Sequence, residues 1–167
     1  HWKVLAFLAF LVLAVYLNSL GNDFLSDDIA TIKDNPLIDQ FSYLASSGFN
    51  LHPTIIFFTH KLFGLNPAFF RLWNILFHLG SVWLVYCLLG FFFATPIPLF
   101  TAGIFAVHPL LTEAVTWISG GPYSNSAFFI LLSLAAYLFW KKNCRKQFYL
   151  VSILSFILAL GFSEKVF

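Results

Sequence analysis

Apolar side chains along this chain gather into long runs separated by short polar or proline-containing segments. The runs expected to cross a membrane cover about residues 2–20, 67–93, 99–107, 126–140 and 148–162. A membrane-spanning helix needs about 20 mainly apolar residues. The third run is short unless Ile97 and Pro98 form its first turn, and the fifth is slightly short. The pattern predicts an all-α, multi-pass integral membrane bundle of about five transmembrane helices.

Composition supports a chain that resides in lipid. Hydrophobic residues make up 60% of it, charged residues only 10%, and the mean hydropathy is +0.85. The net charge of +2 is small and the basic residues form no broad patch, so no nucleic-acid partner is expected. Cys87 and Cys144 lie too far apart in sequence for a CxxC motif or a zinc site.

The first apolar run has a charged flank at Lys3 and could be taken for a secretory signal peptide. No small-x-small cleavage site follows it, and further apolar runs come later, so we interpret it as a retained signal-anchor helix. Because the chain starts at His1 and stops shortly after a Ser-Glu-Lys sequence, we expect it to be a fragment of a longer protein.

Basic residues predict the orientation in the membrane. Residues 141–146 form a tight, Lys/Arg-rich loop, and such loops stay in the cytoplasm. Alternation then places the N-terminus and residues 94–98 in the cytoplasm as well, and residues 21–66 and 108–125 outside. The acidic residues that this topology places on the external face are Asp23, Asp27, Asp28, Asp34, Asp39, Glu113 and Glu164.

The long first external loop contains a helix-like insert at residues 51–63, which ends at Gly64. The insert is too short to span a bilayer, and His52, His60 and Lys61 lie among its large apolar residues. We expect it to lie in the membrane interface, where its cations meet lipid phosphates. The alternative is a re-entrant or simple packing helix.

Asp27 and Asp28 are candidate functional carboxylates in the same loop. On a helix, neighbouring side chains diverge by roughly 100°, so only one of the two is expected to face a given pocket. Such a carboxylate could act as a general base or hold a divalent cation. The structural alternative is that Ser26 or Asp27 caps a short helix that follows.

A second polar cluster contains His108 and Glu113. His108 precedes Pro109, so the third apolar helix should stop there and a new helix should begin at the proline. Ionisable groups at the mouth of a spanning helix are often functional. The alternative is that His108 caps the new helix while Glu113 faces water.

Together these segments resemble the multi-pass GT-C glycosyltransferases, and among them the protein O-mannosyltransferase-like proteins that carry C-terminal tetratricopeptide repeats. The blocks that carry the resemblance are residues 22–28 with 35–38, residues 52–53, 63–67 and 72–78, residues 108–115 with 117–120, and residues 163–165. The resemblance implies that residues 1–167 are the N-terminal part of a GT-C catalytic module. It also implies that the fragment alone is inactive, because later helices close the site.

The implied activity is an inverting, single-displacement transfer of a sugar, expected to be mannose, from a polyprenyl-phosphate carrier. The acceptor would be a protein hydroxyl or a glycan, and the reaction would occur on the extracytoplasmic side of a bacterial plasma membrane or on the lumenal side of the endoplasmic reticulum. By this resemblance Asp27 is the candidate catalytic base, with Asp28 as its support or the second choice. His108 and Glu113 would orient substrate groups.

The leaving phosphate should be stabilised by cations, and the resemblance leaves His52, Lys61 and Arg71 for this role. Related proteins commonly have Arg-Pro where this chain has His52-Pro53. The sequence indicates no certain cofactor. Dependence on a divalent cation, Mg²⁺ or Mn²⁺, held by Asp27 and Glu113, stays open. The competing interpretations are a secondary transporter or flippase, and a non-catalytic membrane scaffold.

Overall fold

The computed structural model describes residues 2–46, 48 and 50–162, and within these ranges it contains helices and no strand. The α-helices are α1 (Trp2–Tyr16), α2 (Phe41–Ser46), α3 (His52–Phe63), α4 (Pro67–Leu89), α5 (Ile97–Val107), α6 (Thr112–Thr116), α7 (Gly121–Asn143) and α8 (Lys146–Phe162). The short 3₁₀ helices are η1 (Leu17–Gly21), η3 (Pro109–Leu111) and η4 (Ile118–Gly120), and η2 (Ile29–Lys33) is a π-helical turn. The all-α prediction is confirmed.

Helix length sets which segments could cross a bilayer. Three segments are long and apolar enough: Trp2–Gly21, Pro67–Leu89 and Ile118–Asn143. A fourth is available if α5 and the following segment Pro109–Thr116, bent by 49° at the His108-Pro109 break, act as one span. Helix α8 is apolar but has only 17 residues. By length, the described residues therefore support three or four spans, and the fifth expected span stays a prediction.

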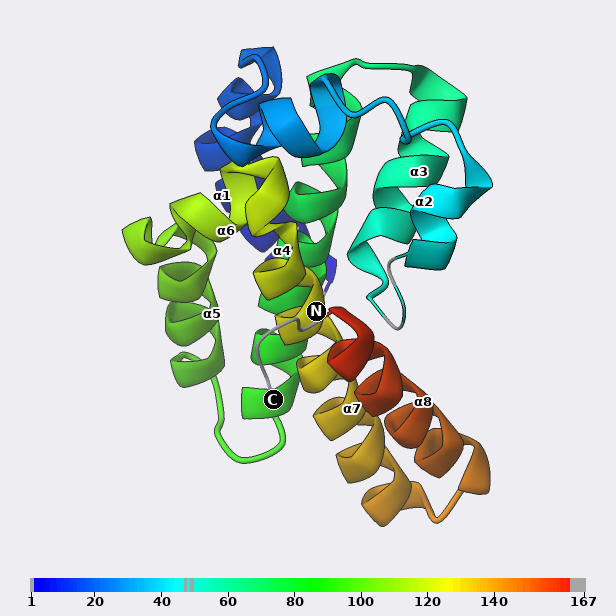
Figure 1. The fold of residues 1–167 in the computed structure, drawn as a ribbon. Coiled ribbons are helices and arrows are strands. Elements are labelled where there is room, and N and C mark those ends of the chain that lie inside the picture. Colours follow the sequence, from blue (N-terminus) through cyan, green and yellow to red (C-terminus); the bar gives the residue numbers. More distant parts are fainter. Residues whose placement is uncertain (1, 47, 49, 163–167) are drawn as a thin grey trace.

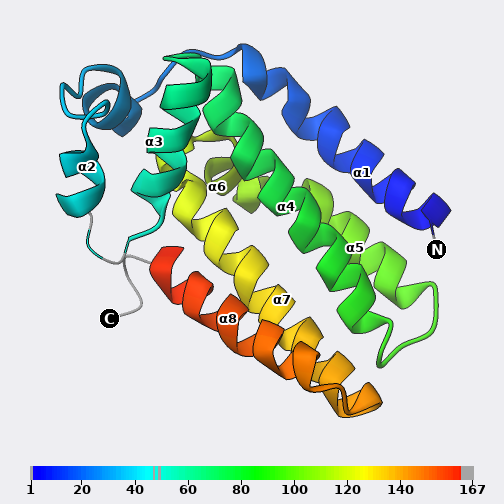
Figure 2. The same ribbon diagram turned by 90° about the vertical axis from the view of Figure 1, so that its right-hand side faces the viewer.

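Helix α4 is the centre of the bundle and packs against α1, α5 and α7 (Figures 1 and 2). The α1–α4–α5 core contains fully buried aliphatic side chains, among them Leu8 of α1, Val82 of α4 and Ala102 of α5. On its other side α4 meets α7 closely at Gly80, where a Cβ atom would lie 2.5 Å from the Phe128 ring. Helices α7 and α8 form an antiparallel pair.

The helices run up and down between two ends of the molecule. The start of α1, the α4–α5 loop and the α7–α8 loop lie toward one end, whereas the first loop, α2, α3 and α6 lie toward the other (Figure 2). This arrangement is compatible with the alternation expected from the sequence, and the membrane topology stays a prediction. Which end faces the cytoplasm stays a prediction from the basic residues.

Several helix boundaries follow the sequence signals. Helix α3 ends at Phe63 because Gly64 adopts a positive φ of 65°. Helix α5 includes Ile97 and Pro98 in its first turn. Helix α7, however, begins at Gly121, earlier than the expected start near residue 126. Its first turns contain buried polar residues, Ser124 and Asn125, which a search for apolar runs excludes.

Candidate functional site

Arg71 joins three segments at the loop-bearing end of the bundle. It lies in the first turns of α4 and is only 2% exposed. Its Nε donates to the carbonyl of Thr116 at 2.9 Å, and its two terminal nitrogens donate to the carbonyls of Asn22 and Asp23. All three groups of the guanidinium are therefore engaged by backbone oxygens. Arg71 anchors the first loop and α6 to α4.

Asp28 makes a second link between the first loop and the segment after α6. Its side chain is fully buried, and one carboxylate oxygen accepts hydrogen bonds from the Ser119 backbone N–H at 2.9 Å and the Ser119 hydroxyl at 2.6 Å. The other oxygen accepts a longer bond, 3.4 Å, from the Leu25 N–H. Since Asp28 occupies the N-cap position of η2 without a side-chain cap, its carboxylate serves the long-range contact. Capping of this turn by Ser26 or Asp27 is not observed.

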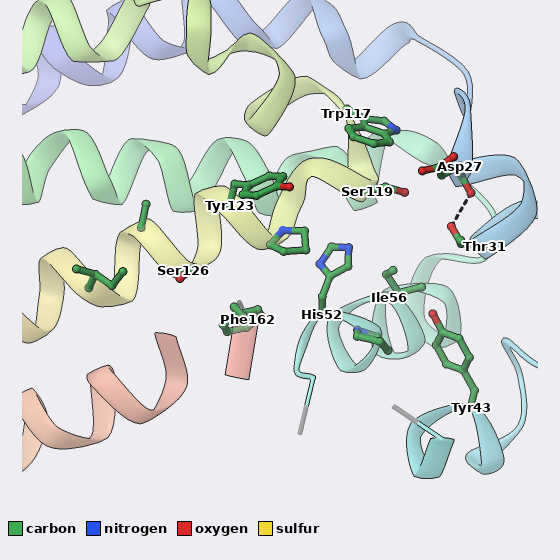
Figure 3. A pocket seen from close by; sticks show the side chains of 14 residues that line it. Asp27, Thr31, Tyr43, His52, Ile56, Trp117, Ser119, Tyr123, Ser126 and Phe162 are labelled. Atoms are coloured by element: carbon green, nitrogen blue, oxygen red, sulfur yellow. Dashed lines mark hydrogen bonds between the residues drawn. The ribbon is translucent and has the colours of Figure 1, made fainter. Parts of the chain in front are cut away.

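Asp27, in contrast, is exposed and lines a cavity of about 510 Å³ (Figure 3). Ser26, immediately before it, has a positive φ of 53°, which turns the chain sharply at this point. The two aspartates thus separate as the sequence predicts: one is buried and structural, and the other is exposed in the cavity. The Asp27 carbonyl accepts a 2.6 Å hydrogen bond from the Thr31 hydroxyl, which also lines the cavity.

The cavity lies where the first loop, α2, α3, η4, α7 and α8 meet. Its lining residues are Asp27, Thr31, Tyr43, His52, Pro53, Ile56, Trp117, Ser119, Pro122, Tyr123, Ser126, Ala127, Ile130 and Phe162. Polar groups gather around Asp27 and Ser119, and apolar side chains of α7 and α8 form another part of the wall. The cavity therefore suits an amphipathic ligand or two ligands of different polarity.

His52 projects into this cavity from the first turn of α3 (Figure 3). It is only 8% exposed, and neither ring nitrogen has a hydrogen-bond partner among the described residues. Burial lowers the pKa of His52 from its ordinary value of 6.5 to about 4, so the ring is neutral at physiological pH. A buried, unpaired imidazole is costly in a stable fold, and this makes His52 a candidate ligand-binding residue.

The position of His52 is fixed by contacts on both ends of α3. The Leu51 N–H, just before the helix, donates to the Gly161 carbonyl at the end of α8 at 2.7 Å. Farther along, Thr59 accepts a 2.9 Å hydrogen bond from the Trp73 indole of α4. Gly121 of α7 packs directly against the imidazole, because a Cβ atom there would lie 2.8 Å from His52 Cε1.

Trp117 provides a second unpaired group in the same wall. Its indole nitrogen is buried and has no hydrogen-bond partner in the described part of the chain. Its backbone carbonyl accepts a 2.9 Å hydrogen bond from Asn74 of α4, so the residue is held in place. Sequence reasoning did not select Trp117 or Ser119 as site residues. The signal for both was the block at 117–120 that resembles the glycosyltransferase sequences.

The other expected site residues lie outside this cavity wall. Lys61 donates to Asp39 at 3.0 Å, and the His60 ring lies 3.1 Å from the same carboxylate. Lys61 and, to a smaller extent, His60 hold the pKa of Asp39 below its usual range. The pairing of Lys61 with Asp39 on the surface satisfies its charge there.

His108 and Glu113 are also absent from the cavity lining. His108 is the N-cap of η3, and its Nδ1 accepts a 3.3 Å hydrogen bond from the Leu110 N–H, while Pro109 takes the first helical position. The capping alternative for His108 is thus observed. Glu113 lies in the first turn of α6 and is exposed. Residues 163–165, the last block of the resemblance, lie outside the described residues.

A divalent cation stays a prediction. Within residues 2–46, 48 and 50–162, no group of three or more His, Cys, Asp or Glu side chains is arranged to share a metal ion. Asp27 lines the cavity and Glu113 does not. The two residues expected to hold the cation therefore do not both line this cavity.

The fold and the cavity define an all-helical membrane protein with a polar pocket at the loop-bearing end of its bundle. The chain is similar to protein O-mannosyl-transferase tmtc2 of Xenopus laevis, with 35% identity over 90% of this chain, and to protein O-mannosyl-transferase TMTC2 of Mus musculus, with 34% identity over 89%. The corresponding human protein is 34% identical over 82% of the chain. The chain is thereby identified as a homologue of the protein O-mannosyltransferase-like proteins.

The chain spans only about a fifth of the length of these relatives: 20% of the frog and mouse proteins and 18% of the human one. No protein-family profile and no solved structure matches it. The relatives support the resemblance that the polar blocks indicated.

Proposed function

We propose that this chain is part of a GT-C membrane glycosyltransferase that transfers mannose from a polyprenyl-phosphate carrier to hydroxyl groups of proteins. The relatives are named protein O-mannosyl-transferases, which supports the sugar, the reaction class and the acceptor. The structural observation that carries the proposal is the carboxylate of Asp27, exposed in a cavity beside the buried, firmly held Asp28. The reaction would take place on the extracytoplasmic side.

In this mechanism Asp27 is the general base. It removes the proton of the acceptor hydroxyl while that oxygen forms a bond to C1 of the sugar. The bond between C1 and the phosphate oxygen breaks in the same step, and the bonding electrons leave with the polyprenyl phosphate. The configuration at C1 is inverted. The base must lie within hydrogen-bond reach of the acceptor, and its position depends on the contact between Asp28 and Ser119.

A transporter or flippase fits the arrangement less well. Transport sites are typically built from ionisable groups and broken helices near the middle of the membrane. Here Asp27 lies in a loop, and His108 and Glu113 lie beyond the end of α5. A non-catalytic scaffold would tolerate Asp27→Asn, whereas a transferase would not.

The test is mannose transfer by the full-length protein that contains this chain. The protein is reconstituted into vesicles with radiolabelled polyprenyl-phosphate-mannose and a peptide rich in Ser and Thr. Asp27→Asn is expected to reduce transfer by at least about a hundredfold, the range of a lost general base. The matched control is Asp34→Asn, since Asp34 is exposed and does not line the cavity. Undiminished transfer by Asp27→Asn at equal expression would remove Asp27 from the mechanism.

A further inference from the structure

We infer that the cavity containing Asp27 and His52 binds the uncharged, hydroxyl-bearing side chain of the polypeptide acceptor, and that it is not the binding site for the donor phosphate. His52 is a specificity-determining residue in this role: it binds the acceptor through one hydrogen bond that it donates and one that it accepts. The inference rests on the proposed function, because that proposal supplies the peptide as acceptor.

The charge of the cavity wall disfavours the donor phosphate. Among the described residues that line the cavity, Asp27 is the one that carries a formal charge at neutral pH, and this charge is negative. His52 is neutral there, since burial lowers its pKa to about 4. Phosphate sites in proteins use Arg, Lys, helix N-termini or metal ions to balance the anion. A phosphate placed in this wall would meet a carboxylate. The first turns of α3 and α7 also border the cavity, but Pro53 and Pro122 each lack the backbone N–H that a phosphate site would use there.

The basic residues that sequence reasoning offered for the phosphate are engaged elsewhere. Arg71 is buried, and its three donor groups bind backbone carbonyls. Lys61 pairs with Asp39. Neither residue lines the cavity. The phosphate-binding cations of the complete enzyme are therefore expected outside this cavity wall.

The unpaired polar groups of the cavity wall favour a ligand that both donates and accepts hydrogen bonds. His52 offers one N–H and one acceptor nitrogen, and both lack partners in the described structure. Trp117 offers an N–H without a partner, and the Ser119 hydroxyl lies in the same wall. This set provides both donors and acceptors. It matches a hydroxyl next to a peptide group, each of which donates and accepts, better than it matches the phosphodiester of the sugar donor, which only accepts.

The size and the aromatic surface of the cavity suit a peptide. Tyr43, Tyr123 and Trp117 border the cavity with aromatic surface, and Ile56 and Phe162 add aliphatic and aromatic contacts (Figure 3). A volume of about 510 Å³ exceeds what a single hydroxyl side chain needs. It leaves room for the flanking peptide backbone to contact the aromatic surfaces.

The first experiment measures binding and does not depend on catalysis. The full-length protein in nanodiscs is titrated with a fluorescent octapeptide that contains one threonine, and inorganic phosphate and polyprenyl phosphate are added as competitors. We expect the peptide to bind and neither competitor to displace it. We expect His52→Phe to weaken peptide binding about tenfold or more, because a buried hydrogen-bonding group is lost. Displacement of the peptide by either phosphate compound would overturn the inference, and so would the absence of peptide binding by the folded wild-type protein.

Matched variants separate loss of hydrogen bonding from loss of fold. His52→Gln keeps one donor and one acceptor and should bind the peptide within about threefold of wild type. Trp117→Phe removes only the indole N–H and should weaken binding as His52→Phe does. His60→Phe lies on the same helix but outside the cavity lining, and it should bind like wild type. Equal losses in His60→Phe and His52→Phe would contradict a specific role of His52.

The second experiment distinguishes failure of this inference from failure of the proposed function. In the transfer assay, His52→Phe should raise KM for the peptide and leave KM for the polyprenyl-phosphate-mannose unchanged. The opposite result, with active enzyme, would refute the inference and leave the transferase function standing. A third result is also informative: the peptide binds in a way that depends on His52, but the wild type transfers sugar from none of the donors. This result would support the peptide-binding site and refute the transferase function.

Discussion

The carboxylate of Asp28 and residue Ser119, which are 91 positions apart in the sequence, are joined by two hydrogen bonds to one carboxylate oxygen. The bond from the Ser119 hydroxyl is short at 2.6 Å, as expected when the acceptor is charged. This contact ties the first loop to the start of η4, and Asp27 is the neighbouring residue. The orientation of the proposed base therefore depends on a residue that takes no part in the chemistry.

Replacing Asp28 by Asn should destabilise the protein. The new amide would point a donor or a weaker acceptor at the Ser119 N–H and hydroxyl, and hydrogen bonds to a charged group contribute about 1.5–3 kcal/mol. We expect a lower melting temperature of the detergent-solubilised full-length protein, and lower transfer because Asp27 is displaced. Ser119→Ala, which keeps the backbone donor, should lose less than Asp28→Asn. Equal melting of Asp28→Asn and the exposed control Asp34→Asn would contradict the structural role of this contact.

Replacing Arg71 should destabilise the protein more than replacing Asp28. The loss of Arg71 leaves the carbonyls of Asn22, Asp23 and Thr116 without their donor and leaves the buried Asp28 without a nearby cation. Breaking a buried charged network typically costs about 3–5 kcal/mol. We expect Arg71→Ala to accumulate poorly and melt early.

Arg71→Lys tests whether charge alone is sufficient. The lysine ammonium lacks the planar fork that reaches three carbonyls from one position, so this variant should be nearly as unstable as Arg71→Ala. The exposed Arg145, in the α7–α8 loop, provides the control Arg145→Lys, which should melt like wild type. Full stability of Arg71→Lys would show that the geometry of the hydrogen bonds is unimportant.

A substitution at Gly121 tests the close packing of α7 against His52. A Cβ atom at this position would lie 2.5 Å from the Asn74 side-chain oxygen and 2.8 Å from the His52 ring. Both side chains would have to move, and Asn74 holds the Trp117 carbonyl. Gly121→Ala should therefore displace His52 and Asn74. We expect it to reduce both peptide binding and mannose transfer by about tenfold or more. Gly21→Ala meets no atom within 4 Å and should behave like wild type.

The sequence predicted the helical class and most helix positions because apolar length and proline or glycine breaks act locally. Gly64 and the His108-Pro109 break are examples. It also predicted that Asp27 and Asp28 would separate, since adjacent side chains diverge. It could not show that Asp28 binds Ser119 or that Arg71 is buried. Both depend on contacts between segments more than 40 residues apart in the sequence.

Lys61 shows a second limit of the sequence. From the sequence, Lys61 is a suitable cation for binding a phosphate, but the acid nearest to it depends on how α3 packs beside the segment that carries Asp39. The structure brings Asp39 to within 3.0 Å of Lys61. His52 lies on the same helix, but it is buried and has no hydrogen-bond partner among the described residues. The orientation of α3 therefore decides which of its basic residues can reach a ligand.

The low pKa of His52 predicts a specific dependence of stability on pH. Its folded pKa, about 4, is below the unfolded value of 6.5. As pH falls below 6.5 the unfolded chain takes up a proton that the folded protein does not, so the free energy of unfolding decreases until the pH reaches about 4. A shift of this size corresponds to on the order of 3 kcal/mol over that window. Above pH 6.5 the protonation of His52 makes no further contribution to the pH dependence of stability.

The measurement is the melting temperature of the detergent-solubilised full-length protein between pH 7.5 and 4.5, for wild type, His52→Gln and His60→Gln. Glutamine does not titrate, so His52→Gln should lose less stability than wild type as the pH falls from 6.5. His60→Gln removes the contact with Asp39 but retains His52, so its curve should still show the loss of stability that His52 causes as the pH falls. Parallel curves for wild type and His52→Gln would show that the imidazole is protonated in the folded state. The cavity would then carry the positive charge of His52 as well as the negative charge of Asp27, and its wall would no longer disfavour phosphate.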